Sequence, residues 1–282
     1  MLVFKQVKDL QKHLKALANQ GRTIGFVPTM GALHEGHISL IKKSKKQTKC
    51  TVCSIFVNPT QFNDAKDFEK YPVTIDADIE KLNSAKCDVL FLPSVNEMYP
   101  DGTGNKRKID FGSLAKVLEG EHRPGHFDGM AQVVERLLRI VKPDLLFMGL
   151  KDYQQQLIVS KLIEKRKLKV KLIALETMRE KDGLAMSSRN VRLNKKARKL
   201  AVEISRTLKK ARQQMADGRW RVIQIQEQAV KRLQSFKGIE VEYFEIRNAK
   251  TLMPPEKKAE KLIALTAVRI GGVRLIDNMI LR

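Results

Sequence analysis

The first two thirds of the chain alternate short apolar runs with longer segments of helical periodicity. Apolar runs rich in β-branched residues predict strands at 23–27, 50–57, 88–92, 145–148 and 169–174. The segments between them carry apolar residues at helical spacing and predict helices at 37–47, 75–86, 129–141 and 154–164. Strands that alternate with helices of this length form βαβ units. The pattern therefore predicts an α/β fold, with a parallel sheet that has helices on both faces.

The pattern changes after about residue 176. A polar loop at 179–190 leads to two helical stretches, at about 194–216 and 220–236. Segments of alternating polarity follow at 239–246, 262–270 and 273–280. We therefore expect a first domain at 1–175 and a smaller α+β domain at 176–282, with 176–190 as a hinge that borders the active site.

Composition is that of an ordinary globular protein, with 282 residues, 43% of them hydrophobic and 30% charged. No apolar run approaches the ~20 residues that span a bilayer, and the N-terminus lacks the pattern of a signal peptide. We therefore expect a cytoplasmic protein with no membrane partner. The three cysteines are too few for a disulfide framework. Cys50 and Cys53 would point to opposite faces of a strand, so we interpret them, like Cys87, as core residues.

The charge is unusual, because 54 Lys and Arg residues against 31 Asp and Glu residues give a net charge of +23. Such a charge favours encounters with anionic ligands and permits non-specific binding of nucleic acid. The basic residues, however, are spread along predicted helices with few aromatic neighbours that could stack on bases. We interpret them as solvated helix faces and expect no nucleic-acid partner. A basic nucleic-acid-binding protein stays the alternative from a different class.

The clearest chemical signal directly follows the first of these strands, in Pro28-Thr29-Met30-Gly31-Ala32-Leu33-His34-Glu35-Gly36-His37. A strand that turns into a helix presents outward-pointing backbone N–H groups and a helix dipole to phosphate. His34 and His37 add donors, and Gly31 and Gly36 allow a close approach of the backbone. The two commonest nucleotide-binding glycine spacings are absent. A loop with a capping or core histidine is the structural alternative.

Polar side chains also follow the second predicted strand. Pro59 forces a turn there, and this leaves Asn58 and Gln61 at the rim of the sheet. Neutral amides suit recognition of hydroxyl and carboxylate groups in a substrate. A turn stabilised by the Asn58 side chain is an equally weighted alternative.

Two further segments carry groups that suit phosphate. After the strand at 145–148, Gly149 permits close approach and Lys151 could place an ammonium on a phosphate, while Asp152 could cap the next helix. In the hinge loop, two hydroxyls precede the guanidinium of Arg189, which can chelate two oxygens. Ligands sit beyond the carboxyl ends of parallel strands, so we expect the loops after residues 27, 57 and 148 to lie side by side.

The remaining histidines carry weaker signals. His122 and His126 lie in a turn before the helix at 129–141 and have no zinc-ligand spacing with a cysteine. A structural role and a role beside the substrate stay equally open for both. His13 lies in an amphipathic N-terminal helix, where we expect it at the surface.

Taken together, these segments resemble the pantoate–β-alanine ligase family over essentially the whole chain. The motifs that carry the resemblance occupy residues 28–37, 56–62, 123–127, 149–155 and 182–190. The resemblance implies a Rossmann-like domain, a smaller C-terminal domain that closes over the active site, and a homodimer. It implies an enzyme that joins (R)-pantoate to β-alanine while ATP becomes AMP and pyrophosphate, through a pantoyl-adenylate. The product, pantothenate, belongs to coenzyme A biosynthesis.

The resemblance also implies roles for individual residues. The catalytic set would be His34, His37, Lys151 and Arg189, with His37 as proton donor. The implied ATP-binding residues are Met30, Gly31, Ala32, Leu33, His34, Glu35, Gly36, His37, Gly149, Leu150, Lys151, Asp152, Met178, Met186, Ser187, Ser188 and Arg189. Gln61 and Gln155 would bind pantoate, with Gln61 also near β-alanine, and Asn58 completes the substrate set.

Two points of the resemblance are less complete. Leu150 stands where many family members carry glutamate, and we expect its side chain to be peripheral. Mg²⁺ is expected to accompany ATP, but its ligands are unassigned; Asp76 and Asp78 lie in the neighbourhood. Another adenylate-forming nucleotidyltransferase, such as an aminoacyl-tRNA synthetase, is the alternative within enzymes.

Overall fold

The computed structural model describes the whole chain except residues 64, 104–108 and 257–259. The described residues divide into two compact units. The first comprises Met1–Leu150 and Gln155–Glu176, and the second comprises Lys151–Gln154 and Thr177–Arg282. The short segment at 151–154 therefore groups with the second unit, although it lies in the chain between two elements of the first.

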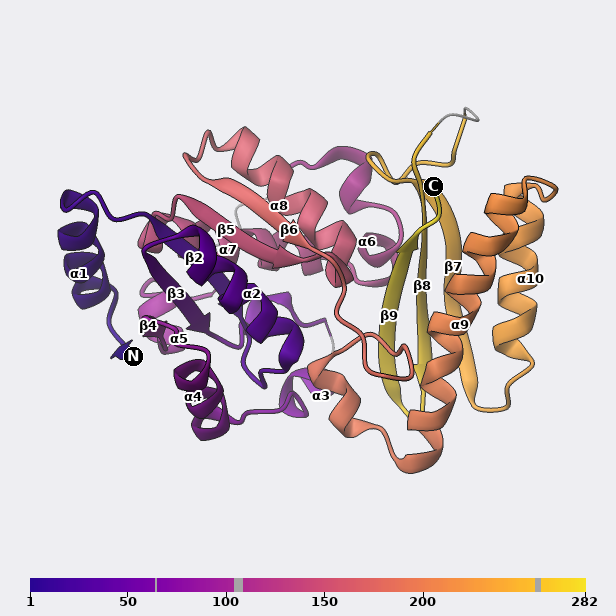
Figure 1. The fold of residues 1–282 in the computed structure, drawn as a ribbon, viewed down its shortest axis with the longest axis horizontal. Coiled ribbons are helices and arrows are strands. Elements are labelled where there is room, and N and C mark those ends of the chain that lie inside the picture. The colour runs from indigo at the N-terminus through magenta and orange to yellow at the C-terminus, as the bar shows by residue number, and fades with distance from the viewer. Residues whose placement is uncertain (64, 104–108, 257–259) are drawn as a thin grey trace. The chain divides into compact units, whose positions relative to one another are not determined.

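The first unit is built on a six-stranded sheet with the order β1-β4-β3-β2-β5-β6 (Figure 1). Its strands are β1 (Leu2–Phe4), β2 (Ile24–Thr29), β3 (Cys50–Ile55), β4 (Val89–Phe91), β5 (Leu145–Gly149) and β6 (Lys171–Leu175). Each neighbouring pair is parallel. The predicted parallel sheet is thus confirmed, and β1 is a strand that the apolar pattern did not predict.

Helices flank this sheet. They are α1 (Val7–Asn19), α2 (Glu35–Gln47), α3 (Ala65–Glu69), α4 (Ile75–Ser84), α5 (Val95–Met98), α6 (Glu119–His122), α7 (His126–Val141) and α8 (Tyr153–Lys165). Three-residue and four-residue 3₁₀ turns occupy Pro59–Gln61, Gly112–Ala115 and Leu150–Asp152. The long helices form where the sequence places apolar residues at helical spacing, as α7 does with Phe127, Met130, Val134 and Leu137, all of them buried.

Strand β2 is longer than predicted, because Pro28 and Thr29 continue it and pair with Ser54 and Ile55 of β3. Proline is tolerated at this position since the registered pairing with β5 covers only residues 25 and 26. β2 and β3 therefore end together. The loops that follow them leave the same edge of the sheet from adjacent positions.

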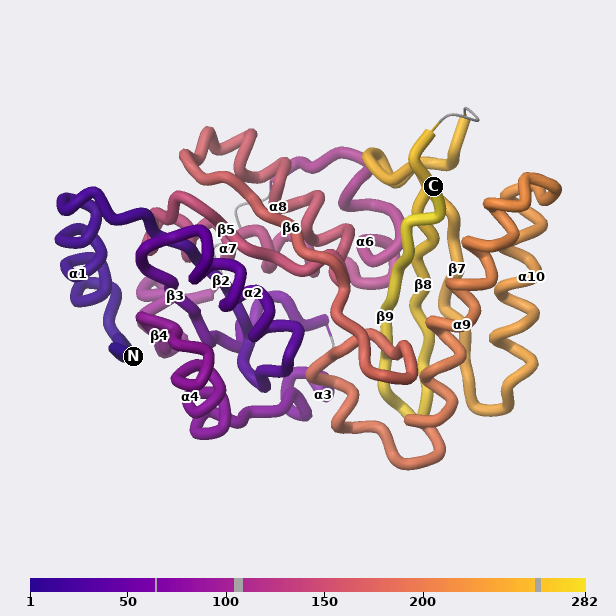
Figure 2. The backbone as a smooth tube through the Cα atoms, in the orientation of Figure 1, coloured from indigo at the N-terminus to yellow at the C-terminus, as the bar shows by residue number. Residues whose placement is uncertain are grey.

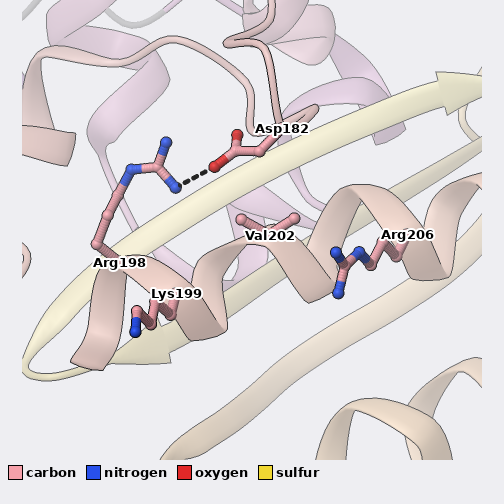
Figure 3. Close-up of a pocket in the computed structure, with 5 residues that line it drawn as sticks. All are labelled: Asp182, Arg198, Lys199, Val202 and Arg206. Atoms are coloured by element: carbon pink, nitrogen blue, oxygen red, sulfur yellow. Dashed lines mark hydrogen bonds and ion pairs between the residues drawn. The ribbon is translucent and has the colours of Figure 1, made fainter. Parts of the chain in front are cut away.

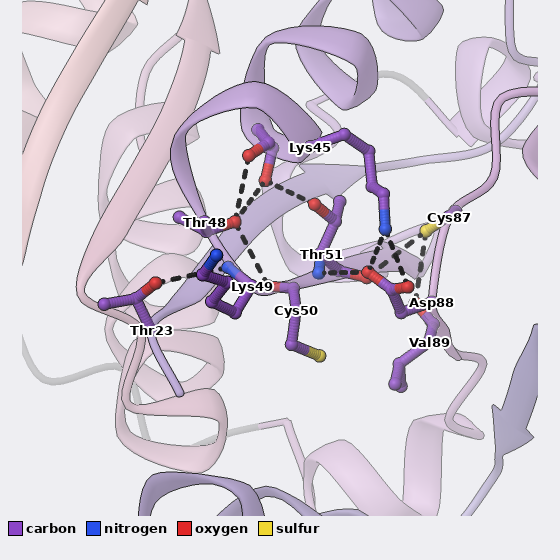
Figure 4. A network of polar contacts seen from close by, with 10 residues as sticks. Thr23, Lys45, Thr48, Lys49, Cys50, Thr51, Cys87, Asp88 and Val89 are labelled. Carbon is purple, nitrogen blue, oxygen red and sulfur yellow. Dashed lines mark hydrogen bonds and ion pairs between the residues drawn. The ribbon is translucent and has the colours of Figure 1, made fainter. Parts of the chain in front are cut away.

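A polar network fastens the C-terminal part of α2 to the sheet (Figure 4). The Lys45 ammonium lies 2.8 Å from both carboxylate oxygens of Asp88, which also accepts the N–H of Thr51 at 2.7 Å. The buried hydroxyl of Ser44 lies 2.8 Å from that of Thr51. These bonds join α2 to β3 and to the residue before β4. They fix the helix whose other end carries the predicted phosphate loop.

The second unit packs two helices on a three-stranded antiparallel sheet with the order β7-β8-β9 (Figure 1). Its elements are α9 (Lys195–Asp217), α10 (Val222–Gln234), β7 (Ile239–Asn248), β8 (Leu262–Ile270) and β9 (Val273–Ile280). Figure 2 traces residues 177–194 as a segment that ends where α9 begins and that includes a 3₁₀ turn at Ser188–Arg192. Trp220 lies between α9 and α10 and is 39% exposed.

The three cysteines are buried and free, as predicted from their strand positions. Burial raises the pKa of Cys50 to about 11 and that of Cys87 to about 12. Burial also raises the pKa of Cys53 well above its ordinary value. His13 differs from expectation, because it is half-buried and its ring centroid lies 5.2 Å from that of Phe4. The short strand β1, missed in the sequence, supplies this neighbour. Among the described residues, no helix combines the length and apolarity that crossing a membrane requires.

Candidate functional site

The loop between β2 and α2 carries the two histidines of the clearest motif. His34 is the N-cap of α2, and His37 is its third helical residue. The Nδ1 atom of His34 accepts the N–H of Gly36 at 3.1 Å, and the Nδ1 atom of His37 accepts the N–H of His34 at 3.3 Å. The two ring centroids are 4.1 Å apart. The imidazoles are therefore held side by side at the start of the helix.

These bonds assign the tautomers of the two rings. A nitrogen that accepts a backbone N–H carries no proton, so each neutral imidazole is protonated at Nε2. The capping role of His34, which the sequence offered as the structural alternative, is thus confirmed. A role of the two Nε2–H groups in ligand binding stays a prediction.

The backbone N–H groups of this loop have partners within the protein. Those of Ala32 and Leu33, in the turn before the helix, donate to the carboxylate of Asp78, at 2.8 and 2.7 Å. At the helix start, where the sequence predicts N–H groups that face a phosphate, the N–H of Gly36 donates to His34. The chain thus satisfies these donors itself, with a buried acid from α4 and a side-chain cap.

The turn after β3 holds Gln61 through a buried asparagine. The Asn58 Oδ1 atom accepts the hydroxyl of Tyr99 at 2.8 Å and that of Thr60 at 3.1 Å. The Asn58 Nδ2 atom lies 3.2 Å from both Gln61 Oε1 and the carbonyl oxygen of Gly129. Asn58 is 1% exposed. It stabilises the turn, as the structural alternative had it, and it orients the Gln61 side chain directly.

Gln61 joins this turn to the histidine loop, because its Nε2 atom lies 2.9 Å from the Sδ atom of Met30. The structure thus brings the first two predicted segments together within the first unit. The third segment begins beside them, since Gly25 and Phe26 of β2 pair with Leu145 and Leu146 of β5. β2 ends at Thr29 and β5 ends at Gly149.

The structure shows the environment of His126, for which the sequence allows either a structural role or a role beside the substrate. It is buried, its Nδ1 atom lies 2.7 Å from the carbonyl oxygen of Gln61, and its Nε2 atom lies 3.1 Å from a guanidinium nitrogen of Arg123. A carbonyl only accepts and a guanidinium only donates, so His126 is the neutral Nδ1–H tautomer. It supports the backbone of Gln61. His122, in contrast, is exposed.

The α7 helix touches the backbone of the same turn. A Cβ atom on Gly129 would lie 2.2 Å from the carbonyl oxygen of Thr60 and 3.0 Å from the N atom of Gln61. Only glycine permits this approach. Gly129 and His126 lie about one turn apart on α7. Together they determine how closely the backbone of the Gln61 turn approaches this helix.

In the second unit, Lys151 is tied to β9. The carbonyl oxygen of Lys151 accepts the Nδ2 of Asn278 at 2.8 Å, and its ammonium lies 3.5 Å from the Asp152 carboxylate. The hydroxyl of Tyr153 donates to the carbonyl oxygen of Ala249 at 2.9 Å. Gln155, the first residue back in the first unit, is half-buried.

The segment expected as a hinge folds back on itself. The N–H of Met186 donates to the carbonyl oxygen of Met178 at 3.0 Å, so the two predicted methionines lie opposite each other. Arg179 binds the buried Asp277 through both guanidinium nitrogens, at 2.7 and 2.9 Å, and donates to the carbonyl oxygen of Asn278 at 3.1 Å. β9 therefore holds this segment and, through Asn278, also Lys151.

Ser187 and Ser188 begin the next short turn. The Ser187 hydroxyl accepts the N–H of Arg189 at 3.3 Å and caps the 3₁₀ turn Ser188–Arg192, while Ser188 is 9% exposed. This geometry places both serines and Arg189 in one tight turn directly after Met186. Phosphate binding by these three residues stays a prediction.

Arg198 of α9 fastens the other side of the same loop. It binds Asp182 at 2.7 Å and Glu180 at 3.0 Å, at the edge of an open pocket (Figure 3). The lining residues are Asp182, Arg198, Lys199, Val202 and Arg206. The hydrogen bond from Arg198 lowers the pKa of the Asp182 carboxyl, and that bond also raises the pKa of Arg198. Sequence reasoning missed Arg198, as it missed Asp277 and Asn278.

The described residues contain no group of three or more His, Cys, Asp or Glu side chains that could hold a metal ion. Of the two acids near the motif, Asp76 is exposed and Asp78 is buried with its oxygens bound to the loop.

Comparisons with known proteins cover the whole length of the chain. The sequence model of the pantoate-beta-alanine ligase family matches residues 2–280. A pantothenate synthetase from Cytophaga hutchinsonii is 42% identical over 283 residues, which cover 100% of this chain and 99% of the relative. Another from Aquifex aeolicus is 43% identical and the match covers 98% of each chain.

Solved structures agree with this. The crystal structure of pantothenate synthetase from Thermus thermophilus has a TM-score of 0.93 at 36% identity and covers 100% of this chain and 99% of its own. That of pantoate-beta-alanine ligase from Francisella tularensis, complexed with beta-gamma ATP and beta-alanine, has a TM-score of 0.85 at 37% identity. It covers 100% of this chain and 98% of its own.

Proposed function

This chain belongs to the pantoate-beta-alanine ligase family, and we propose that it condenses (R)-pantoate with β-alanine to pantothenate while ATP becomes AMP and pyrophosphate. The observation that carries the proposal is the family match over residues 2–280, which includes all five motifs. The Francisella tularensis relative, complexed with beta-gamma ATP and beta-alanine, supports the assignment of two of the substrates.

The test is an assay of AMP release with each substrate left out in turn. We expect AMP release to require ATP, pantoate and β-alanine together, and pantoate alone to support exchange of pyrophosphate into ATP. Exchange that depended on an amino acid instead of pantoate would favour another adenylate-forming enzyme. Tight, salt-sensitive binding of oligonucleotides without any exchange would favour a nucleic-acid-binding protein.

In the first step, a carboxylate oxygen of pantoate attacks the α-phosphorus of ATP. The bond from that phosphorus to the bridging oxygen breaks, and its electron pair leaves with pyrophosphate. Negative charge accumulates on the phosphoryl oxygens and on the leaving group, so donors fixed in advance lower the barrier. We propose that the Nε2–H groups of His34 and His37, the ammonium of Lys151 and the guanidinium of Arg189 are these donors.

In the second step, the amine of β-alanine attacks the acyl carbon of pantoyl-adenylate. The bond from that carbon to the phosphate oxygen breaks, AMP leaves with the electron pair, and the positively charged nitrogen loses a proton to water. Positioning is the main contribution that the protein has to make, since holding two reactants together can supply roughly 7–11 kcal/mol. His37, implied as proton donor by the resemblance, is proposed to act in the first step, by donating its Nε2–H as a hydrogen bond to the leaving pyrophosphate.

We propose the following binding roles. ATP is bound by Met30 to His37, Gly149 to Asp152, Met178 and Met186 to Arg189. Gln61 and Gln155 bind pantoate through their amides. Asn58, whose amide is engaged with protein atoms, serves the substrate by orienting Gln61.

ATP is proposed to arrive as its Mg²⁺ complex. Mg²⁺ keeps several waters and is commonly held by substrate phosphates rather than by a protein cage. The homodimer is also proposed, on the resemblance to the family, and light scattering after size exclusion should give about twice the 32.2 kDa of one chain. The cytoplasmic location stays a prediction.

A further inference from the structure

Asp78 is a buried carboxylate whose hydrogen-bond donors come largely from the histidine loop. It lies in α4 and is 0% exposed. Oδ2 accepts the N–H of Ala32, while Oδ1 accepts the N–H of Leu33 and, at 3.2 Å, the hydroxyl of Thr74. An ionised carboxylate is costly to bury unless such donors surround it. The burial of the Asp78 carboxylate and the shape of the loop therefore depend on each other.

The loop needs this support because its backbone is left-handed at two consecutive residues. Gly31 has φ +82° and Ala32 has φ +47°, a region that L-residues other than glycine rarely adopt. This conformation turns the N–H groups of residues 32 and 33 toward one point. Successive N–H groups of this kind form an anion-binding concavity. Here the protein's own carboxylate fills it.

A second charged side chain of α4 holds the same peptide segment. The Lys81 ammonium donates to the carbonyl oxygen of Leu33 at 2.6 Å. Leu33 is thus held at its N–H by Asp78 and at its C=O by Lys81, two residues three apart on α4. The next residue in the chain is His34, the N-cap of α2. A shift of Leu33 therefore moves the imidazoles directly.

We propose that Asp78, supported by Lys81, is a positioning residue that sets the Nε2–H groups of His34 and His37 on the triphosphate. The inference rests on the proposed function. Asp78 touches neither substrate nor metal in this role, because its oxygens bind the loop. The histidines serve the phosphates that leave in the first step. Loss of the Asp78 contacts should therefore slow adenylate formation more than the transfer to β-alanine.

The test is Asp78→Asn, which keeps the shape of the side chain but offers one acceptor oxygen in place of two. Pantoate-dependent pyrophosphate exchange should fall by about 100-fold, the size of effect expected when a catalytic group is displaced by about 1 Å. Transfer from pre-formed pantoyl-adenylate to β-alanine should fall far less. Glu80→Gln, the same chemical change at an exposed position of α4, is the matched control and should leave both half-reactions unchanged.

A purely structural role of Asp78 predicts a different result, in which both half-reactions fall in the same proportion as the folded fraction. That result would overturn the proposal. If Asp78→Asn does not fold, Lys81→Met provides the same comparison at an exposed residue. It should reduce exchange by about twofold to tenfold, the equivalent of one hydrogen bond, again with less effect on transfer.

Amide hydrogen exchange tests the contact without reference to activity. The amides of residues 32 and 33 should exchange faster in Asp78→Asn than in the unaltered protein, while those of β5 should not change. Unchanged exchange at residues 32 and 33 would refute the positioning role. Absence of pantoate-dependent activity in the unaltered protein would refute the proposed function instead. The amide measurement would then still show whether Asp78 holds the N–H groups of residues 32 and 33.

Discussion

His37 has one ring nitrogen for a ligand, because the other accepts a hydrogen bond from the N–H of His34. The same division holds for His34, whose Nδ1 accepts the N–H of Gly36. A protonated ring would lose its acceptor and with it the cap. At the scale of single residues, the cap at the start of α2 therefore depends on Nδ1 atoms that accept hydrogen bonds.

Replacement of His37 by alanine should lower pantoate-dependent pyrophosphate exchange by about 10²–10³, as removal of one fixed donor to a developing charge does in other enzymes. His13→Ala, in α1, is the control for loss of a histidine and should retain exchange. Near-normal exchange in His37→Ala would show that another group supplies the hydrogen bond to the leaving pyrophosphate.

The cysteines give a second prediction at this scale. Burial holds the pKa of Cys50 at about 11 and that of Cys87 at about 12, so both are protonated thiols at neutral pH. A thiol reagent should label the folded protein slowly and label three thiols after unfolding. Fast labelling of the folded chain would contradict the buried placement.

The same shifts make stability depend on alkaline pH. The thiols ionise near pH 8.5–9 in the unfolded chain but only near pH 11–12 when folded. Their contribution is thus complete below about pH 8.5 and is lost as pH rises through the window up to about 11–12, because the folded state binds more protons there. Urea unfolding at several alkaline pH values measures this decrease.

At the scale of elements, α7 determines where the Gln61 turn lies. Gly129→Ala would place a methyl group 2.2 Å from the backbone oxygen of Thr60, and backbone cannot rotate away as a side chain can. We expect KM for pantoate to rise and the free energy of unfolding to fall by about 1–3 kcal/mol. Arg139→Ala, on the exposed side of α7, is the control for KM. An unchanged KM for pantoate would show that the position of the Gln61 turn does not affect pantoate binding.

Much of this architecture could be predicted, because most helices and strands have a recognisable pattern within their own residues. The strands of the first sheet are apolar runs, and the histidine loop and the Asn58 turn carry their polar residues in short motifs. The partners of those motifs could not be found this way. Asp78 lies 45 residues beyond Leu33, and Asp277 lies 98 residues beyond Arg179. Neither has a periodicity or spacing that relates it to its partner, so only the folded chain reveals the contact.

Strand β1 and the end of strand β2 were not predicted for a related reason, because they also depend on partners distant in the sequence. β1 has three residues, too few to show an alternation, and its Leu2 and Val3 are exposed. β2 extends through Pro28, a residue that normally ends a central strand. In both cases pairing with a neighbour, rather than local preference, makes the strand.

At the scale of the whole molecule, the net charge of +23 should affect the encounter with ATP. Long-range attraction of an anion weakens as the Debye length falls from about 30 Å at 0.01 M salt to about 8 Å at 0.15 M. We expect kcat/KM for ATP to decrease over this range. β-Alanine, a zwitterion without net charge, is the internal control, and its KM should change little. A value of kcat/KM for ATP that does not change with salt concentration would show that the net charge does not attract ATP over long distances.

Trp220 is the sole tryptophan of the chain, and it sits part-exposed at the turn between α9 and α10. Its indole emission therefore reports on the second unit without any engineered label. Far-ultraviolet circular dichroism, in contrast, sums over the helices of both units. When denaturant is added, coincident curves from the two signals would mean that the units melt as one cooperative body, and separated curves would give each unit its own transition.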